Sequence, residues 1–109
     1  MAKHLLTSVK ELKARQRVTQ WVGREEVMAL MTPSGVRVYS AMCPHQGGPL
    51  GEGKLGEGKI TCPWHGCSFE LDRGGCTDLG ACRNVSGMKL KALDFSIDPQ
   101  DNVYVELAD

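Results

Sequence analysis

The sequence has no long hydrophobic run and no net charge. No stretch of its 109 residues approaches the roughly 18 consecutive apolar residues of a membrane-spanning helix, and the first residues contain no apolar core of an export signal. The 13 basic and 13 acidic side chains balance, so the concentrated positive charge that binds nucleic acids or anionic membranes is missing. We therefore expect a cytoplasmic protein whose partners are neither nucleic acids nor membranes.

Cysteine and histidine are also scarce, with five and three residues respectively. An odd number of cysteines without an export signal disfavours a framework of disulfide bonds, so the cysteines are expected to bind metal or to remain free thiols. The length of 109 residues fits one compact domain. We expect a single domain over residues 1–109, and nothing in the sequence requires more than a monomer.

Short segments with alternating apolar and polar residues predict an all-β fold, a small antiparallel sandwich or barrel. Ser8 is followed three residues later by Glu11, a capping-box pattern that predicts one helical turn after the first strand. A closing hairpin is expected at the end of the chain, with its turn over residues 98–102. The predicted strands cover residues 3–7, 17–22, 27–31, 36–39, 90–97 and 103–107.

The middle of the chain, from Cys43 to Cys82, is rich in glycine. It contains ten of the 13 glycines and three of the five prolines, which disfavours helices and long strands and favours loops. Two copies of Leu-Gly-Glu-Gly-Lys occupy residues 50–54 and 55–59, and we interpret them as a glycine-rich turn. Each copy ends a Gly-x-x-x-x-Gly-Lys pattern, but leucine or isoleucine follows where a phosphate-binding loop needs serine or threonine, so that function is excluded.

Two mixed pairs of potential metal ligands lie in this segment, Cys43 with His45 and Cys62 with His65, and 16 residues separate the pairs. Two thiolates and two imidazoles can hold one tetrahedral zinc ion or a [2Fe-2S] cluster. Zinc sites commonly take a pair of like residues from each element, whereas a mixed pair lets each loop bridge two metal atoms that need different donors. The spacing favours the cluster, and a zinc-stapled binding module remains the alternative.

The segments CPHQGGPL, residues 43–50, and CPWHGCSF, residues 62–69, resemble the two cluster-binding loops of the Rieske family. The whole chain is similar to small Rieske-type ferredoxins, with the cluster-binding loops forming a subdomain within about residues 42–82. The resemblance implies one Rieske-type [2Fe-2S] cluster, with two thiolates on the inner iron and two imidazoles on the outer, solvent-facing iron. The ligands it implies are Cys43, His45, Cys62 and His65.

The resemblance also implies a function. Small Rieske ferredoxins of aromatic-ring dioxygenase systems carry single electrons from a flavin-containing NAD(P)H reductase to a terminal oxygenase, and we expect the same role here, without catalytic residues. A Rieske oxygenase needs a further mononuclear iron with two histidines and a carboxylate, and only His4 is left over, so that enzyme is expected only if this chain is a fragment. The small subunit of an assimilatory nitrite reductase is a further alternative, ranked lower because all four ligands are present.

Four positions differ from the Rieske subunits of respiratory and photosynthetic complexes. Those subunits have two further cysteines that form a disulfide bond, where this chain has Gly48 and Trp64. They also have a serine and a tyrosine whose hydroxyls donate hydrogen bonds to sulfur, where this chain has Cys67 and Phe69. The cysteines outside the ligand set are expected to be free thiols: Cys67, Cys76 and Cys82.

These differences predict a low reduction potential. Hydrogen bonds to cluster sulfur favour the reduced state, and each contributes about 0.5–1.5 kcal/mol, while 59 mV corresponds to about 1.4 kcal/mol for one electron. Losing two of them should lower the potential by about 50–130 mV, into the lower half of the Rieske range of about −150 to +300 mV. A redox titration that gives a value above about +150 mV would contradict this prediction.

Overall fold

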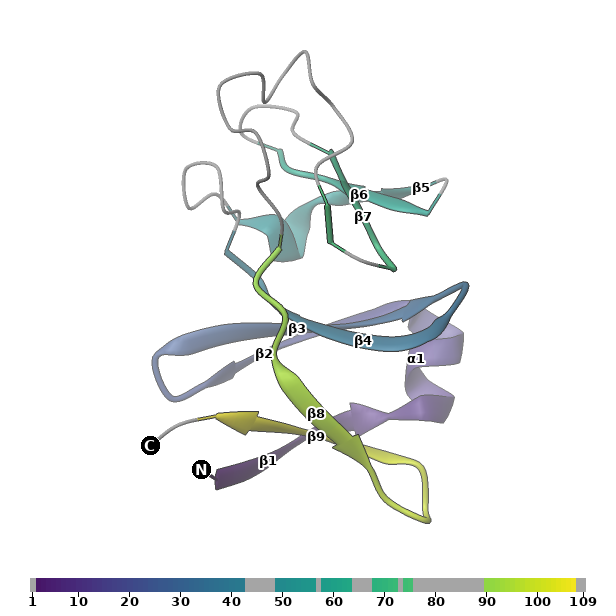
Figure 1. Ribbon diagram of the computed structural model, residues 1–109, viewed down its shortest axis with the longest axis vertical. Helices are drawn as coiled ribbons and strands as arrows, with labels where there is room; N and C mark the ends of the chain where they lie inside the picture. The colour runs from purple at the N-terminus through teal and green to yellow at the C-terminus, as the bar shows by residue number, and fades with distance from the viewer. Residues whose placement is uncertain are drawn as a thin grey trace.

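The computed structural model describes residues 2–42, 49–56, 58–63, 68–72, 74–75 and 90–107. Within these ranges the chain forms three antiparallel sheets of three strands each, which confirms the predicted all-β class (Figure 1). The elements are β1 (Ala2–Ser8), α1 (Val9–Arg15), β2 (Arg17–Val22), β3 (Glu25–Thr32), β4 (Gly35–Ser40), the 3-10 turn η1 (Leu50–Glu52), β5 (Lys54–Gly56), β6 (Lys59–Thr61), β7 (Ser68–Glu70), β8 (Asp94–Ile97) and β9 (Asn102–Leu107).

The three sheets are stacked along the long axis of the molecule (Figure 1). The lower sheet has the strand order β1-β9-β8, the middle sheet β2-β3-β4, and the upper sheet β5-β6-β7. Both ends of the described chain meet in the lower sheet, where Ala2 pairs with Leu107. Cys62, the predicted ligand that the structure describes, directly follows β6 of the upper sheet.

Two hydrophobic cores lie on opposite faces of the middle sheet. Strand β3 contributes to both, because successive side chains of a strand point to opposite faces. The upper core contains Met28, Leu30, Tyr39, Ala41, Leu50, Ile60, Cys62, Phe69, Leu71 and Leu90. The lower core contains Leu6, Leu12, Val27, Ala29, Val36, Val38, Val103 and Val105.

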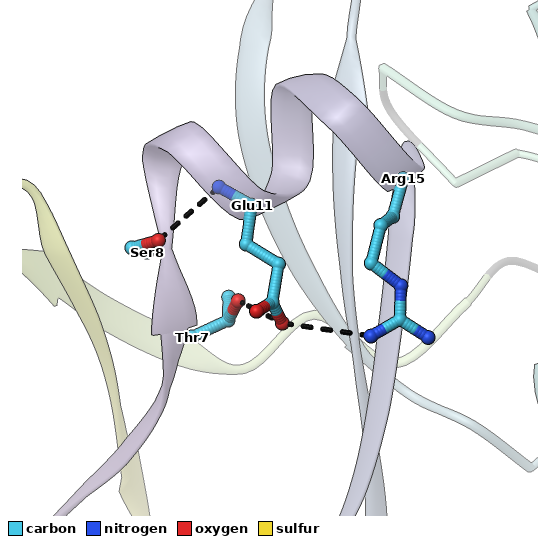
Figure 2. A network of polar contacts seen from close by, with 4 residues as sticks. All are labelled: Thr7, Ser8, Glu11 and Arg15. Atoms are coloured by element: carbon cyan, nitrogen blue, oxygen red, sulfur yellow. Dashed lines mark hydrogen bonds and ion pairs between the residues drawn. The ribbon is translucent and has the colours of Figure 1, made fainter.

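Helix α1 begins as the capping pattern predicts. The Ser8 Oγ accepts a hydrogen bond from the backbone N–H of Glu11 at 3.1 Å (Figure 2). The Glu11 carboxylate accepts a hydrogen bond from Thr7 Oγ1 at 3.1 Å and lies 3.8 Å from the Arg15 guanidinium. The helix has seven residues and so exceeds the predicted single turn, because the fully buried Leu12 anchors it to the lower core. Among the described residues no helix is long and apolar enough to cross a bilayer.

The structure corrects two predictions about local structure. The repeat over residues 50–59 is not a turn along its whole length: it forms η1, β5 and the start of β6, because Leu50 and Ile60 are buried in the upper core. The chain reverses near Gly58, whose φ of 74° is one that glycine adopts readily. The predicted strand over residues 90–97 is regular only from Asp94, and before it Ala92 makes an isolated bridge to Tyr39.

A side-chain hydrogen-bond network closes the turn between β8 and β9. The Asp98 carboxylate accepts hydrogen bonds from the backbone N–H groups of Asn102 at 2.8 Å and Gln100 at 3.0 Å, and from the Asn102 side chain at 3.1 Å. The bond from the Asn102 backbone is the main reason why the pKa of Asp98 lies below its ordinary value of 3.8. This network lies in the lower sheet, at the opposite end of the molecule from β5–β7 (Figure 1).

Gly53 lies in a crowded position between η1 and β6. A Cβ atom at Gly53 would lie 2.6 Å from the carbonyl oxygen of Thr61 and 2.9 Å from that of Leu50, and both are backbone atoms. Its φ of −66° is open to any residue, so the need for glycine is steric. A Cβ at Gly56, on β5, would meet nothing within 4 Å. Gly53 and Gly56, two of the four glycines of the repeat, therefore differ in how closely the chain packs around them.

Replacing each of these glycines by alanine tests that difference. Gly53→Ala is expected to lower the free energy of unfolding by about 1–3 kcal/mol, the usual cost of adding atoms to a packed site. Gly56→Ala, in the neighbouring strand, is expected to change it by less than about 0.5 kcal/mol. Denaturant unfolding of both variants gives the comparison, and equal stabilities would contradict the close packing of Gly53.

Candidate metal centre

Cys62 is the predicted ligand that lies within the described part of the chain. It directly follows β6, and because side chains alternate along a strand it shares the inward face of Ile60. Only 1% of its surface is exposed, and its thiol is free. The other three predicted ligands, Cys43, His45 and His65, lie outside the described residues.

The ends of both predicted ligand segments are held together by strand pairing. An antiparallel bridge between Met42 and Pro49 brings together the two ends of residues 43–48. Thr61 pairs with Ser68, and their hydroxyl oxygens lie 2.9 Å apart, which brings together the two ends of residues 62–67. Each predicted Cys and His pair therefore belongs to a six-residue connection with a fixed base.

The base of the second connection is apolar. Leu50, Ile60 and Phe69 are fully buried in the same core as Cys62. Phe69 therefore brings an aromatic ring without a hydroxyl group into this core, at the position where the high-potential Rieske proteins place a tyrosine. The other positions that the sequence analysis singled out lie outside the described residues: Gly48, Trp64, Cys67, Cys76 and Cys82.

The donor chemistry at this position fits an iron–sulfur cluster. A thiol excluded from water in an apolar core is poorly placed to ionise unless its charge is balanced, and bound iron supplies that balance. Among the described residues no group of three or more His, Cys, Asp or Glu side chains could hold a metal ion by itself. The sequence predicts Cys43, His45 and His65 as the other ligands, which with Cys62 make up the two-thiolate, two-imidazole set of a Rieske site.

His4, the third histidine, belongs to another part of the fold. It lies on β1 opposite Val105 and is half-buried. Strand β1 is in the lower sheet, far from β5–β7 along the long axis (Figure 1). His4 therefore lies apart from Cys62, in a different sheet from the strand that Cys62 follows.

Sequence reasoning did not identify three side chains of the middle sheet that contact the upper sheet: Arg17, Arg37 and Tyr39. The Tyr39 phenol is buried, and its burial raises the pKa of Tyr39 above the ordinary value of 10.0, although the nearby Arg37 opposes the shift. The phenol therefore keeps its proton and remains a hydrogen-bond donor. Period-two alternation places Arg37 and Tyr39 on one face of β4, but it gives no sign of what they contact.

Parts of several known proteins are similar in sequence to this chain. The apoptosis-inducing factor 3 proteins of Mus musculus and Homo sapiens are each 29% identical to it over 83 residues, which is 76% of this chain and 14% of each relative. The 3-chlorobenzoate-3,4-dioxygenase oxygenase subunit of Comamonas testosteroni is 38% identical over 60 residues, 54% of this chain and 14% of that protein. The chain thus spans about one seventh of the length of these relatives.

Solved structures with the same fold match nearly the whole chain. The ferredoxin of carbazole 1,9a-dioxygenase from Nocardioides aromaticivorans IC177 has a TM-score of 0.75 at 23% identity, covering 96% of this chain and 97% of that one. A complex of reduced oxygenase and oxidized ferredoxin in carbazole 1,9a-dioxygenase gives 0.75 at 18% identity, covering 94% and 91%. A putative nitrite reductase NADPH small subunit gives 0.69 at 19% identity, covering 98% and 100%. At these identities the likeness shows a shared fold.

A family model described as the Rieske [2Fe-2S] domain matches residues 2–92. The matched region includes both predicted ligand segments, the bridge at the base of the first and the strand pairing at the base of the second. The chain therefore belongs to the Rieske [2Fe-2S] domain family, whose cofactor is one [2Fe-2S] cluster.

Proposed function

We propose that this chain is a one-electron carrier built as a single Rieske domain over residues 1–109. The observation that supports the proposal most strongly is the buried free thiol of Cys62, which stands at the fixed base of a predicted ligand loop in a chain of the Rieske family. The proposed ligands are Cys43, His45, Cys62 and His65. When bound, the cluster supplies reversible uptake of one electron.

The proposed metal centre would lie between the apolar upper core and the protein surface. Cys62 faces the apolar upper core, so the core excludes water from the thiolate side. Pro63, the next residue, is exposed, and so is Met42, which directly precedes Cys43 and has 63% of its surface accessible. Each proposed cysteine ligand therefore has an exposed neighbour in the sequence: Met42 directly precedes Cys43, and Pro63 directly follows Cys62. We propose that a partner meets the imidazole side of the cluster at this surface.

The proposed partners are a flavin-containing NAD(P)H reductase, which donates the electron, and a terminal aromatic-ring oxygenase, which accepts it. The likeness to the carbazole 1,9a-dioxygenase ferredoxin supports this assignment, as does the likeness to a ferredoxin in complex with its oxygenase. We propose that docking is transient, takes place at the end of the molecule that contains Met42 and Pro63, and leaves the protein a cytoplasmic monomer between encounters. Substrate chemistry would then belong to the oxygenase.

A nitrite reductase small subunit is the second candidate. The solved putative small subunit of that kind covers this chain almost completely, with a TM-score of 0.69. The carrier is preferred because all four proposed cluster ligands are present in the sequence.

Substitution of a proposed ligand tests the centre itself. Cys43→Ser and Cys62→Ser are expected to abolish the visible absorbance and the electron paramagnetic resonance signal of a Rieske cluster, because each removes one of two thiolates from the same iron. Cys82→Ser is the matched control, since Cys82 is expected to be a free thiol, and it should keep both signals. A normal Rieske spectrum in Cys43→Ser would refute the ligand assignment. A colourless wild-type protein that binds zinc would refute the cluster.

Stopped-flow spectroscopy tests the proposed role. Protein reduced by NAD(P)H through a flavin-containing reductase should be reoxidised by a terminal aromatic-ring oxygenase, with transfer of one electron per molecule. The change in visible absorbance follows both half-reactions. Reoxidation by a nitrite reductase catalytic subunit, and by no oxygenase, would contradict the proposal and favour the second candidate.

A further inference from the structure

Two arginines of the middle sheet lie on its upper, core-facing side. Arg17 on β2 and Arg37 on β4 are both paired with Leu30 on β3, and residues that are directly opposite each other in a sheet share a face. Leu30 belongs to the upper core. In the adjacent row Tyr39 is opposite Met28, and both also belong to the upper core. The side of the sheet that faces β5–β7 therefore contains two guanidinium groups and a phenol among apolar side chains.

Each of these three side chains donates a hydrogen bond to a backbone carbonyl oxygen of the segment that forms the upper sheet. Arg17 Nη1 lies 2.5 Å from the Gly53 oxygen. Tyr39 Oη lies 2.9 Å from the Leu71 oxygen, and Arg37 Nε lies 3.1 Å from the Asp72 oxygen. These acceptors occupy both ends of the upper sheet.

The three acceptor oxygens lie where they can hold the strands of the upper sheet in place. Gly53 directly precedes β5, whereas Leu71 and Asp72 follow β7. Strands β5, β6 and β7 have three residues each, and sheets of such short strands are marginal without support from packing. Hydrogen bonds from charged donors are stronger than those between neutral groups, and a buried carbonyl left without a donor is costly. The middle sheet therefore holds the first and last strands of the upper sheet in place.

A short path of contacts links this support to Cys62. The Gly53 backbone packs so closely against the Thr61 carbonyl oxygen that a Cβ at Gly53 would lie 2.6 Å from it, and Thr61 directly precedes Cys62. On the other side, Leu71 donates its N–H to the Gly58 oxygen at 2.9 Å, next to the start of β6. A shift at either acceptor would thus move β6, the strand that directly precedes Cys62.

We propose that Arg17, Arg37 and Tyr39 are positioning residues for the cluster: by donating to carbonyl oxygens at both ends of the upper sheet, they fix Cys62 relative to the middle sheet. The inference rests on the proposed ligand set. It goes beyond a general contribution to stability, because the sheet that carries a ligand is held at both ends by side chains from another sheet. A purely structural role would lower the resistance to unfolding and leave the cluster of the native protein unchanged.

The experiment compares cluster loss in the full-length, cluster-containing protein with its variants. Tyr39→Phe removes one donor and keeps the ring, and Arg17→Met removes another at a half-exposed position. Each variant is expected to lose its visible absorbance to an iron chelator about fivefold faster than wild type. A fivefold change in rate corresponds to RT ln 5, about 1 kcal/mol, which is the net contribution of one hydrogen bond. The reduced cluster should also give a broader electron paramagnetic resonance spectrum. All measurements are made well below the unfolding temperature.

Asp98→Ala is the matched control. It removes a hydrogen-bonded side chain from the turn between β8 and β9, in the lower sheet, and so should lower the unfolding temperature without changing cluster loss or the resonance spectrum. If Tyr39→Phe does not fold, Arg17→Met decides the question. Wild-type rates and spectra in Arg17→Met or in Tyr39→Phe, or an equal acceleration in Asp98→Ala, would overturn the inference. A wild-type protein without a Rieske spectrum would overturn the proposed function as well, so the two failures are distinguishable.

Discussion

The burial of β3 on both faces is the constraint on which the rest of the fold depends. Residues Val27 to Leu30 have no exposed surface, and they alternate between the lower and the upper core. A strand of this kind needs a strand on each side and a packed layer above and below, which β2, β4 and the two outer sheets provide. The lower sheet covers one face with long strands, and the upper sheet covers the other with short ones. The proposed metal centre is attached to the side with the shorter strands.

This division explains why the site needs support from the body of the protein. The lower sheet is stabilised by long strands, by α1 and by the pairing of the two chain ends, whereas the upper sheet has few backbone pairs of its own. Its placement comes from Leu50, Ile60 and Phe69 in the upper core, from the close packing at Gly53, and from donors on the middle sheet. The proposed ligand Cys62 would therefore depend for its position on contacts with neighbouring elements.

The sequence predicted the long strands well, whereas the ligand set stays a prediction, and the reasons are physical. Strands with one polar face show period-two alternation, so β2 and β4 could be recognised, and cluster chemistry requires specific donors, which made the Cys and His pairs identifiable. The repeat over residues 50–59 was misassigned because its glycines and lysines hide the buried Leu50, and because the buried Ile60 lies just beyond it. The segment before Asp94 was predicted as strand. It lies beside β4 without regular strand pairing, and the Ser40 N–H donates to the Lys91 oxygen while the Leu93 N–H donates to the Val38 oxygen.

The two arginines on the inward face of the middle sheet show what sequence patterns leave out. An alternating strand places Arg17 and Arg37 on the side of Leu30, where a charged group is unfavourable unless it finds a partner. The partners are carbonyl oxygens from residues more than 30 positions away, and backbone acceptors leave no mark in a sequence. Local rules are broken most often where function sets the requirement. Here the exception falls on the face that supports the upper sheet, next to the proposed ligand Cys62, where the proposed redox centre would need a fixed position.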